Sequence, residues 1–403
     1  MKISCTIVVV SFLFYYESGY CRKLHLIHSE VVWRHGDRTP LRTYPNNPNE
    51  HKWKQPLDQL TTLGMRQHYE LGQYFRKRYQ NLISKFYLPS EIFVLTGNNS
   101  RTISSALANL AGLYPPHSWQ IFNETLNWQP IPTYQAKDAE VSIEPTWESC
   151  DAWLEERKKQ ESLPDYIETL QLAQPIMDFF ENKTGLSLDF LTLFMLLDSF
   201  ICEEVHNISH PSWLSEQDLK YSYQFSTKAF YYVFGTKLQQ KLLGGVLLNK
   251  IRNTLTDVLK NKPAHKLRIY SGHDVNIAAL TTLLDISNDI LPPYASALMF
   301  EVYADKINGS KYLMLSFRNS TMHVPYEMRI PFCHMNILCP LSTFIDSTKS
   351  LVIEDYYREC NQLKESQEET GSYLTFYIFL ALVFALFVLV CDVNVRPPVV
   401  KIK

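Results

Sequence analysis

VVWRHGDRTP, residues 31–40, sets two arginines, a histidine and an aspartate directly behind an apolar run. The run begins at Leu24 and predicts a buried strand that ends where the charged residues begin. A charged turn at a sheet edge would account for such a cluster. A site that holds a dianion would account for it too, and that interpretation requires matching residues elsewhere in the chain.

Two later segments show the same order of strand, polar cluster and helix. The apolar run 91–98 precedes SRT at 100–102, and KLRIYSGHD ends in GHD at 272–274. In open α/β sheets, ligands bind beyond the carboxyl ends of strands, where helix N-termini also offer donors to anions. We therefore expect RHGDR at 34–38, SRT and GHD to form one anion site.

Helical spacing predicts a helix over 61–79, and a Ser cap with a stop at Pro115 predicts another over 100–116. The segment 266–284 predicts a strand, a turn and a helix. SALMFEVYAD and KYLMLSFRN predict an antiparallel pair of strands.

Few strand signals occur between residues 129 and 249, which predicts a mostly helical cap subdomain. Strand–loop–helix units on both sides of this block predict an α/β catalytic domain built from residues 21–128 and 250–365.

The residue types in the three clusters fit the hydrolysis of a phosphate ester. Arg34, Arg38 and Arg101 supply planar, permanently charged donors that can converge on one phosphate. His35 is a nitrogen nucleophile that can form a phosphohistidine. Asp274 can give the leaving oxygen its proton, and His273 can donate to a phosphate oxygen.

Three arginines and two histidines provide the charge stabilisation, so we predict no metal and no other cofactor. R-H-G-x-R-x-P fixes five positions, and chance would place it in a chain of this length about once in ten thousand. SRT and GHD carry weight only in its company. His206 and His210, in a polar turn beside a sequon, are assigned no chemistry.

Both ends of the chain carry targeting patterns. Residues 1–20 have an early lysine, an apolar core and then small and polar residues, which is typical of a signal peptide. Residues 373–391 contain no charge and are long enough to cross a bilayer, and the basic tail 392–403 is typical of a cytoplasmic segment. We expect a single-pass type I membrane protein. A lipid-anchor signal is the alternative, but such signals normally end in apolar residues.

Composition agrees with an extracellular or lumenal catalytic domain. The formal charge of −2 gives no basic footprint, so nucleic acid is not an expected partner. The tail VNVRPPVVKIK lacks a tyrosine-based or dileucine-type sorting signal, which favours the plasma membrane over the lysosome. Six N-x-S/T sequons agree with a secretory route, at Asn98, Asn123, Asn182, Asn207, Asn308 and Asn319.

RHGDRTP with a late HD resembles the histidine phosphatase superfamily, in its acid phosphatase branch. LTTLGMRQHYELGQYFRKRY, SALANLAGLYPP, CEEVHNISHPSW, LPPYAS and YYREC are similar to prostatic and lysosomal acid phosphatases, and the two ends resemble lysosomal and testicular members. The resemblance implies a phosphoglycerate-mutase-like fold, with a central mixed, largely parallel sheet flanked by helices and a helical subdomain over the cleft. It also implies that the six residues named above hold the family's catalytic positions, with His35 as nucleophile and Asp274 as proton donor.

The chain departs from the family pattern in two places. TGNNSRT stands where the family has a Ser-Thr-Asp segment, so Asn98 is a sequon three residues from Arg101. A glycan there would crowd the site, and we expect the sequon to be unused. Ala297 stands where the family has the cysteine that pairs with Cys202, so Cys202 should lack its partner. The remaining bridges implied by the resemblance are Cys150–Cys360 and Cys333–Cys339.

The function expected from these observations is a membrane-tethered acid phosphatase that acts on phosphate monoesters. A phytase or a lysophospholipid phosphatase would use the same chemistry on another substrate. A receptor or adhesion ectodomain without catalysis is the alternative from another class, and the presence of both His35 and Asp274 argues against it. A homodimer is left open.

Overall fold

A computed structural model describes residues 23–136, 149–319 and 324–361 of the chain. The predicted signal peptide, membrane span and tail lie outside these described residues. Within the described ranges, no helix is long and apolar enough to cross a membrane. The membrane anchor therefore stays a prediction.

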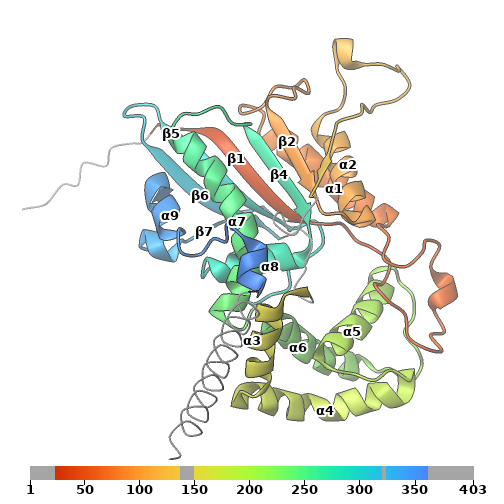
Figure 1. The fold of residues 1–403 in the computed structure, drawn as a ribbon. Coiled ribbons are helices and arrows are strands. Elements are labelled where there is room, and N and C mark those ends of the chain that lie inside the picture. Colours follow the sequence, from red (N-terminus) through yellow and green to blue (C-terminus); the bar gives the residue numbers. More distant parts are fainter. Residues whose placement is uncertain (1–22, 137–148, 320–323, 362–403) are drawn as a thin grey trace, which may run out of the picture.

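One mixed sheet lies at the centre of the upper part of the molecule (Figure 1). Its order is β3-β2-β4-β1-β5-β6-β7, and β8 pairs with β6. The strands are β1 (Leu24–Arg34), β2 (Ile92–Thr96), β3 (Tyr134–Gln135), β4 (Leu267–Gly272), β5 (Ala297–Asp305), β6 (Lys311–Arg318), β7 (Tyr326–Met328) and β8 (Leu338–Pro340).

The mixed sheet is confirmed, but the expectation that it is largely parallel is wrong. The pairs β3–β2, β2–β4 and β4–β1 are parallel, whereas β1–β5, β5–β6, β6–β7 and β6–β8 are antiparallel. The short turn between β5 and β6 can join only antiparallel neighbours, as the sequence predicted for that pair. Because β5 also runs against β1, the antiparallel half begins next to the central strand.

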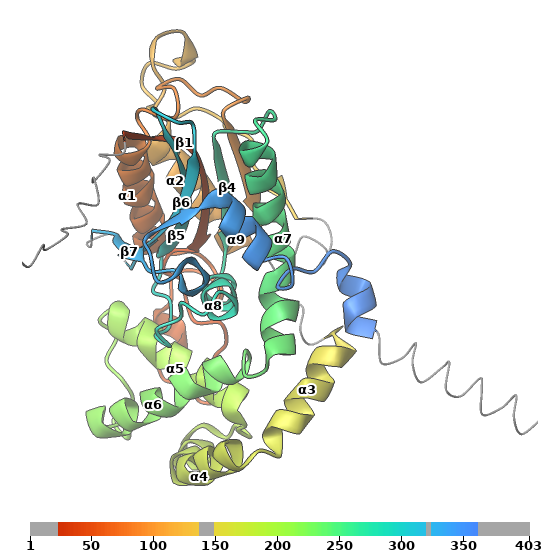
Figure 2. The ribbon, with the colours of Figure 1, turned by 90° about the vertical axis from the view of Figure 1, so that its left-hand side faces the viewer.

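Alternate side chains of β1 enter two separate cores, as strand geometry requires. Val31 and Trp33 pack with α1 and α2, whereas Val32 packs with α7 and α8. Figure 2 shows α1 on one side of the sheet and α7 and α9 on the other. The helices of these layers are α1 (Thr62–Arg78), α2 (Ser100–Leu113), α7 (Lys237–Leu259), α8 (Asp274–Leu283) and α9 (Leu341–Ser347).

A helical layer lies beyond one end of the sheet (Figure 1). Local signals start its helices: Pro164 occupies a first-turn position, the Asp189 side chain accepts from the Thr192 N–H, and Ser215 forms a capping box. The apolar faces of the helices that begin at Pro164, Phe190 and Glu216 share a core rich in phenylalanine. The helices are α3 (Asp151–Glu161), α4 (Pro164–Thr184), α5 (Phe190–Val205) and α6 (Glu216–Tyr232).

The predicted domain limit between residues 249 and 250 falls inside α7. Leu242 and Val246, in the first half of this helix, pack with α3 and α6. Ile251 and Leu255, further along, pack in the core that covers the sheet. A single helix therefore belongs to both layers, and no loop marks the limit there.

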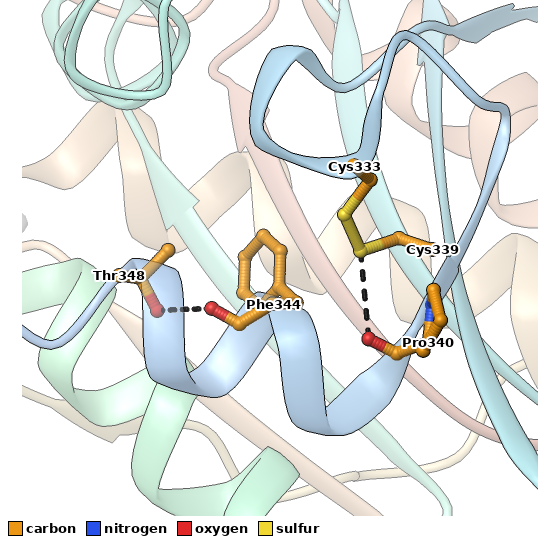
Figure 3. Close-up of a disulfide and its surroundings, with 5 residues drawn as sticks. All are labelled: Cys333, Cys339, Pro340, Phe344 and Thr348. Atoms are coloured by element: carbon orange, nitrogen blue, oxygen red, sulfur yellow. Dashed lines mark hydrogen bonds between the residues drawn. A yellow bond between two sulfur atoms is a disulfide. The ribbon is translucent and has the colours of Figure 1, made fainter.

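Both bridges implied by the family resemblance are present. Cys150–Cys360 links the start of α3 to the C-terminal segment, across a sequence separation of 210 residues. Cys333–Cys339 closes a short loop beside α9, whose last turn is held by a hydrogen bond from Thr348 Oγ1 to the Phe344 carbonyl (2.7 Å, Figure 3). In the described part of the chain, Cys202 is buried and is not in a disulfide, as predicted.

Candidate active site

Strand register brings the three predicted clusters to one edge of the sheet. Arg34 at the end of β1 lies opposite Gly272 of β4, and Thr96 of β2 lies opposite Ser271. The His35 N–H donates to the Gly272 carbonyl (2.8 Å). The carboxyl ends of β1, β2 and β4 therefore lie side by side, where a ligand is expected in a sheet of this kind.

A cavity of about 140 Å³ opens at this edge. Five of the six predicted site residues line it, namely His35, Arg38, Arg101, His273 and Asp274. Arg34 reaches the group through Asp274, because its Nη2 is 2.9 Å from Asp274 Oδ2. The structure thus brings all six predicted residues together.

His35 is buried, and its Nδ1 lies 2.8 Å from the Gly36 carbonyl. Because a carbonyl only accepts, Nδ1 carries the proton in this contact and Nε2 keeps its lone pair. Burial lowers the pKa of His35 well below its usual value, and the positive charge of Arg34 lowers it further. The imidazole is therefore neutral. A side chain at Gly36 would collide with the backbone of Gly64, which explains the glycine of the RHG motif.

Each of the three arginines is paired with a carboxylate. Arg34 contacts Asp274, and Arg38 makes two hydrogen bonds to Asp198 of α5 (2.8 and 2.9 Å). Arg101 Nη1 lies 2.6 Å from Asp58 Oδ1. Two of these partners, Asp198 and Asp58, were not among the predicted site residues.

Asp274 begins α8, where its Oδ1 accepts from the Val275 N–H (2.8 Å). Burial raises the pKa of this carboxyl group, but the charges of Arg34 and His273 outweigh burial and hold the pKa below its usual value. Asp274 is therefore a carboxylate at neutral pH.

Arg101 lies in the first turn of α2, where the helix dipole favours an anion. Asn99, not a serine, occupies the N-cap position, and its side chain accepts from Arg101 Nη1 (2.7 Å) instead of capping the helix. Asn98 is exposed, so its side chain lies outside the cavity that Arg101 lines. That this sequon is unused stays a prediction.

The family model "Histidine phosphatase superfamily (branch 2)" matches residues 25–318. The chain belongs to this superfamily. Prostatic acid phosphatase of Bos taurus is 35% identical over 361 residues, which cover 88% of this chain and 92% of that protein. Lysosomal acid phosphatase of Homo sapiens is 34% identical over 372 residues, which cover 91% and 87%. The predicted membership of the histidine acid phosphatase family is confirmed.

Solved structures of phytases share the fold of this histidine phosphatase. The phytase from Citrobacter braakii superposes with a TM-score of 0.62 over 83% of this chain and 99% of that chain. A Hafnia alvei phytase in complex with tartrate gives 0.62 over 82% and 98%. Both are 19% identical to the chain, so the likeness shows the fold alone.

Tyr294 is a partly buried residue beside the arginines of this histidine phosphatase, and it was not among the predicted site residues. Its ring centre lies 4.1 Å from the Arg34 guanidinium carbon and 5.9 Å from that of Arg38. The same ring lies 5.7 Å from the His35 ring. The only signal was its place in the family-like segment LPPYAS, because the aromatic itself has no periodic or motif context.

His206 was assigned no role, yet it contacts the RHGDR loop. Its Nε2 lies 2.7 Å from Asp37 Oδ2, and its ring meets the Trp53 ring edge-on at 5.2 Å. His210 instead faces Glu203, at 3.4 Å. The two histidines of this turn therefore differ in position, which the sequence did not reveal.

The helical layer covers the cavity with apolar side chains. α5 contributes Leu191, Phe194 and Met195, and α6 contributes Ala229 and Phe230. Among the described residues that line the cavity, the permanently charged cations are Arg38 and Arg101. In the described part of the chain, no group of three or more histidine, cysteine or carboxylate side chains is placed to hold a metal ion.

Proposed function

We propose that this histidine phosphatase is an acid phosphatase that hydrolyses phosphate monoesters, with His35 as nucleophile and Asp274 as proton donor. The observation that carries the proposal is the neutral His35 imidazole, whose Nε2 keeps its lone pair in a cavity shared with Arg38, Arg101 and His273. A neutral ring nitrogen beside several cationic donors is what attack on a phosphate needs.

In the first step, His35 Nε2 attacks phosphorus and the bond from phosphorus to the ester oxygen breaks. Asp274, in its protonated form, gives its proton to the leaving oxygen, so an alcohol departs. Arg34, Arg38, Arg101 and His273 bind the non-bridging oxygens. In the second step, a water attacks the phosphohistidine, Asp274 takes its proton, and inorganic phosphate leaves with His35 restored.

The lowered pKa of Asp274 determines how the proton arrives. The charge of Arg34 holds the Asp274 carboxyl in its charged form. A phosphate group brings negative charge next to Asp274 and competes for Arg34, and both changes raise the pKa of the carboxyl. A substrate that binds as a monoanion also brings the needed proton with it. Both routes favour turnover at acidic pH.

The experiment that tests the proposal is rapid acid-free quenching with radiolabelled substrate. We expect a phosphohistidine at His35 that is labile to acid and stable to base. The His35→Ala variant should lose activity at least ~10³-fold, the range seen when a covalent nucleophile is removed. Label on a serine, or an active His35→Ala enzyme, would overturn the covalent scheme.

Lysophospholipid phosphatase is a second candidate function, and the apolar wall of α5 and α6 favours it over phytase. Phytate carries several phosphates, which would need more cationic groups than the described lining offers beyond the central site. An alkyl or acyl chain would instead cover Leu191, Phe194 and Met195. A panel of glycerol phosphate, a lysophosphatidic acid and phytate, assayed on the secreted catalytic domain across pH, would separate these substrates.

We further propose a lumenal or extracellular catalytic domain tethered by the predicted helix 373–391, with a homodimer left open. The two disulfides fit an oxidising compartment, and most sequon asparagines are exposed. One of the relatives reported above is a lysosomal acid phosphatase, and that name fits a lumenal catalytic domain. An epitope tag at Lys403 that stains intact, unpermeabilised cells would contradict the topology.

A further inference from the structure

The RHGDR loop is fixed to α5 at two successive residues. Arg38 pairs with Asp198 inside the helix, and Asp37 meets His206 at its C-terminal end. Arg38, which the first contact holds, lines the cavity and so belongs to the site. Asp37, which the second contact holds, does not line the cavity.

Asp37 is fully buried and highly connected. Its Oδ2 accepts from His206 Nε2 (2.7 Å) and from the Thr61 hydroxyl. Its N–H donates to Gln67 Oε1 (2.8 Å), and its carbonyl accepts from the Thr61 N–H (3.0 Å). Asp37 Oδ1 has no hydrogen-bond partner among the described residues. A buried carboxylate depends on the donors it has, so losing one of two should change its orientation.

His206 is itself held in place. Its N–H is within 3.2 Å of the carbonyls of Cys202 and Glu203 at the end of α5, and its ring rests against Trp53. About a quarter of its side chain is exposed. The ring therefore offers a fixed donor to the buried carboxylate of the loop.

We propose that His206 is a positioning residue for phosphate binding, acting through Asp37 on the side chains of His35 and Arg38. Asp37 is the neighbour of Arg38 and lies two residues after His35, so any rotation of its backbone redirects both groups. His206 does not line the cavity. The inference rests on the proposed function for its kinetic readout, but phosphate binding tests it independently.

The experiment compares His206→Ala, His206→Gln and Asp37→Asn in the full chain, with His210→Ala as the matched control. His210 lies in the same turn with a similarly exposed side chain (21% against 25%) and faces Glu203, not the loop. In His206→Ala, the inhibition constant of inorganic phosphate should rise, and kcat/KM for p-nitrophenyl phosphate should fall, each by about tenfold or more. His206→Gln, which keeps a donor, should recover most of the loss, and His210→Ala should stay within about twofold of wild type.

Wild-type phosphate affinity in His206→Ala would overturn the inference. An equal loss in His210→Ala, or no recovery in His206→Gln, would overturn it too, because general loosening of the turn would then explain the effect. If His206→Ala does not fold, Asp37→Asn decides: it should bind phosphate about tenfold more weakly. The rise in Tm on adding phosphate measures binding without turnover, so a chain without phosphatase activity would sink the proposed function and still test this inference.

Discussion

The sheet edge and the helical layer meet at one cavity and supply different kinds of groups. The end of β1, together with the loops and first helical turns that follow β1, β2 and β4, provides every side chain to which the proposed chemistry gives a role. The helical layer provides a carboxylate for Arg38, a donor for Asp37 and an apolar wall. The sheet edge holds the reacting groups, whereas the helical layer holds their counter-charges and forms the apolar wall of the cavity.

This difference predicts how substitutions in the two regions should behave. A change at the sheet edge should slow the hydrolysis of phosphate esters, and the loss of rate should grow with the basicity of the leaving group. A change in the helical layer should instead alter stability, phosphate affinity or the choice of alcohol. Variants in the two regions can therefore test whether the sheet edge and the helical layer have these separate roles.

The largest differential effect is expected for Asp274→Ala at the sheet edge. An alkyl alkoxide is a far more basic leaving group than a nitrophenolate, so it depends more on a proton donor. Proton donation by a placed side chain contributes on the order of 10²-fold or more. Hydrolysis of glycerol phosphate should therefore fall by about 100-fold more than that of p-nitrophenyl phosphate. Equal losses on both substrates would mean that Asp274 only binds or positions, and that His273 is the next candidate donor.

The same variant should also change how kcat/KM depends on pH. Because Arg34 holds the pKa of Asp274 low, the proton must come with a monoanionic substrate or reach Asp274 after the substrate binds. In the wild type, kcat/KM for an alkyl phosphate should fall with rising pH above about pH 6, where a phosphate monoester loses its second proton. For p-nitrophenyl phosphate, this alkaline limb should flatten in Asp274→Ala, since that leaving group departs unaided. If the alkaline limb is unchanged in Asp274→Ala, the proton that this limb reports does not come from Asp274.

The next largest effect is expected for the ion pair that joins the two regions. Arg38 and Asp198 are both buried, so Asp198→Ala leaves a guanidinium without its counter-charge and should cost about 3–5 kcal/mol of unfolding free energy. Asp58→Ala is the matched control within the sheet domain. The Asp58 side chain is 36% exposed, so losing its pair with Arg101 should cost at most about 1 kcal/mol. Denaturant unfolding measures both, and equal costs would remove the distinction between the two pairs.

The sheet edge was predictable because its signals are short and contiguous. The apolar run from Leu24 continues to Arg34 as β1, and the helix predicted over 61–79 is observed as α1, Thr62–Arg78. RHGDR, SRT and GHD each follow such a run, so the sheet's register alone brings them together. The prediction of a largely parallel sheet was wrong because the apolar pattern of a strand does not show whether its neighbour runs parallel or antiparallel to it.

Contacts from the helical layer were not predictable in this way. Asp198 lies 160 residues from Arg38, on a helix that also carries Glu203 and Glu204. Nothing in helical periodicity tells which carboxylate of that helix turns toward an arginine so far away. His206 and His210 look alike in sequence, and only the end of α5 separates their environments. The paired groups depend on long-range packing, which a local pattern does not encode.

A smaller effect is expected in the apolar wall. Met195→Ala should raise KM for a lysophosphatidic acid by about tenfold, the scale of a few lost methylene contacts in a hydrophobic pocket. KM for glycerol phosphate, which has no apolar chain, should stay within about twofold. Steady-state kinetics on the two substrates checks this. A parallel change on both would place Met195 in the general packing of α5, and the wall would lose its part in substrate choice.

The smallest effect is expected at Cys202, which lies between the two regions. Its Sγ is 3.8 Å from Arg38 Nη1 and 3.8 Å from the Tyr294 hydroxyl, too long for either contact to be a strong hydrogen bond. Burial raises the pKa of the thiol, so the group stays neutral and acts as a small apolar residue. Cys202→Ala should therefore cost about 1 kcal/mol, whereas Cys150→Ala opens a bridge between distant segments and should cost about 2–5 kcal/mol. The amounts of secreted protein and the unfolding midpoints of the two variants test this. A loss in Cys202→Ala as large as in Cys150→Ala would mean that the thiol supports the Arg38–Asp198 pair more than its contact distances indicate.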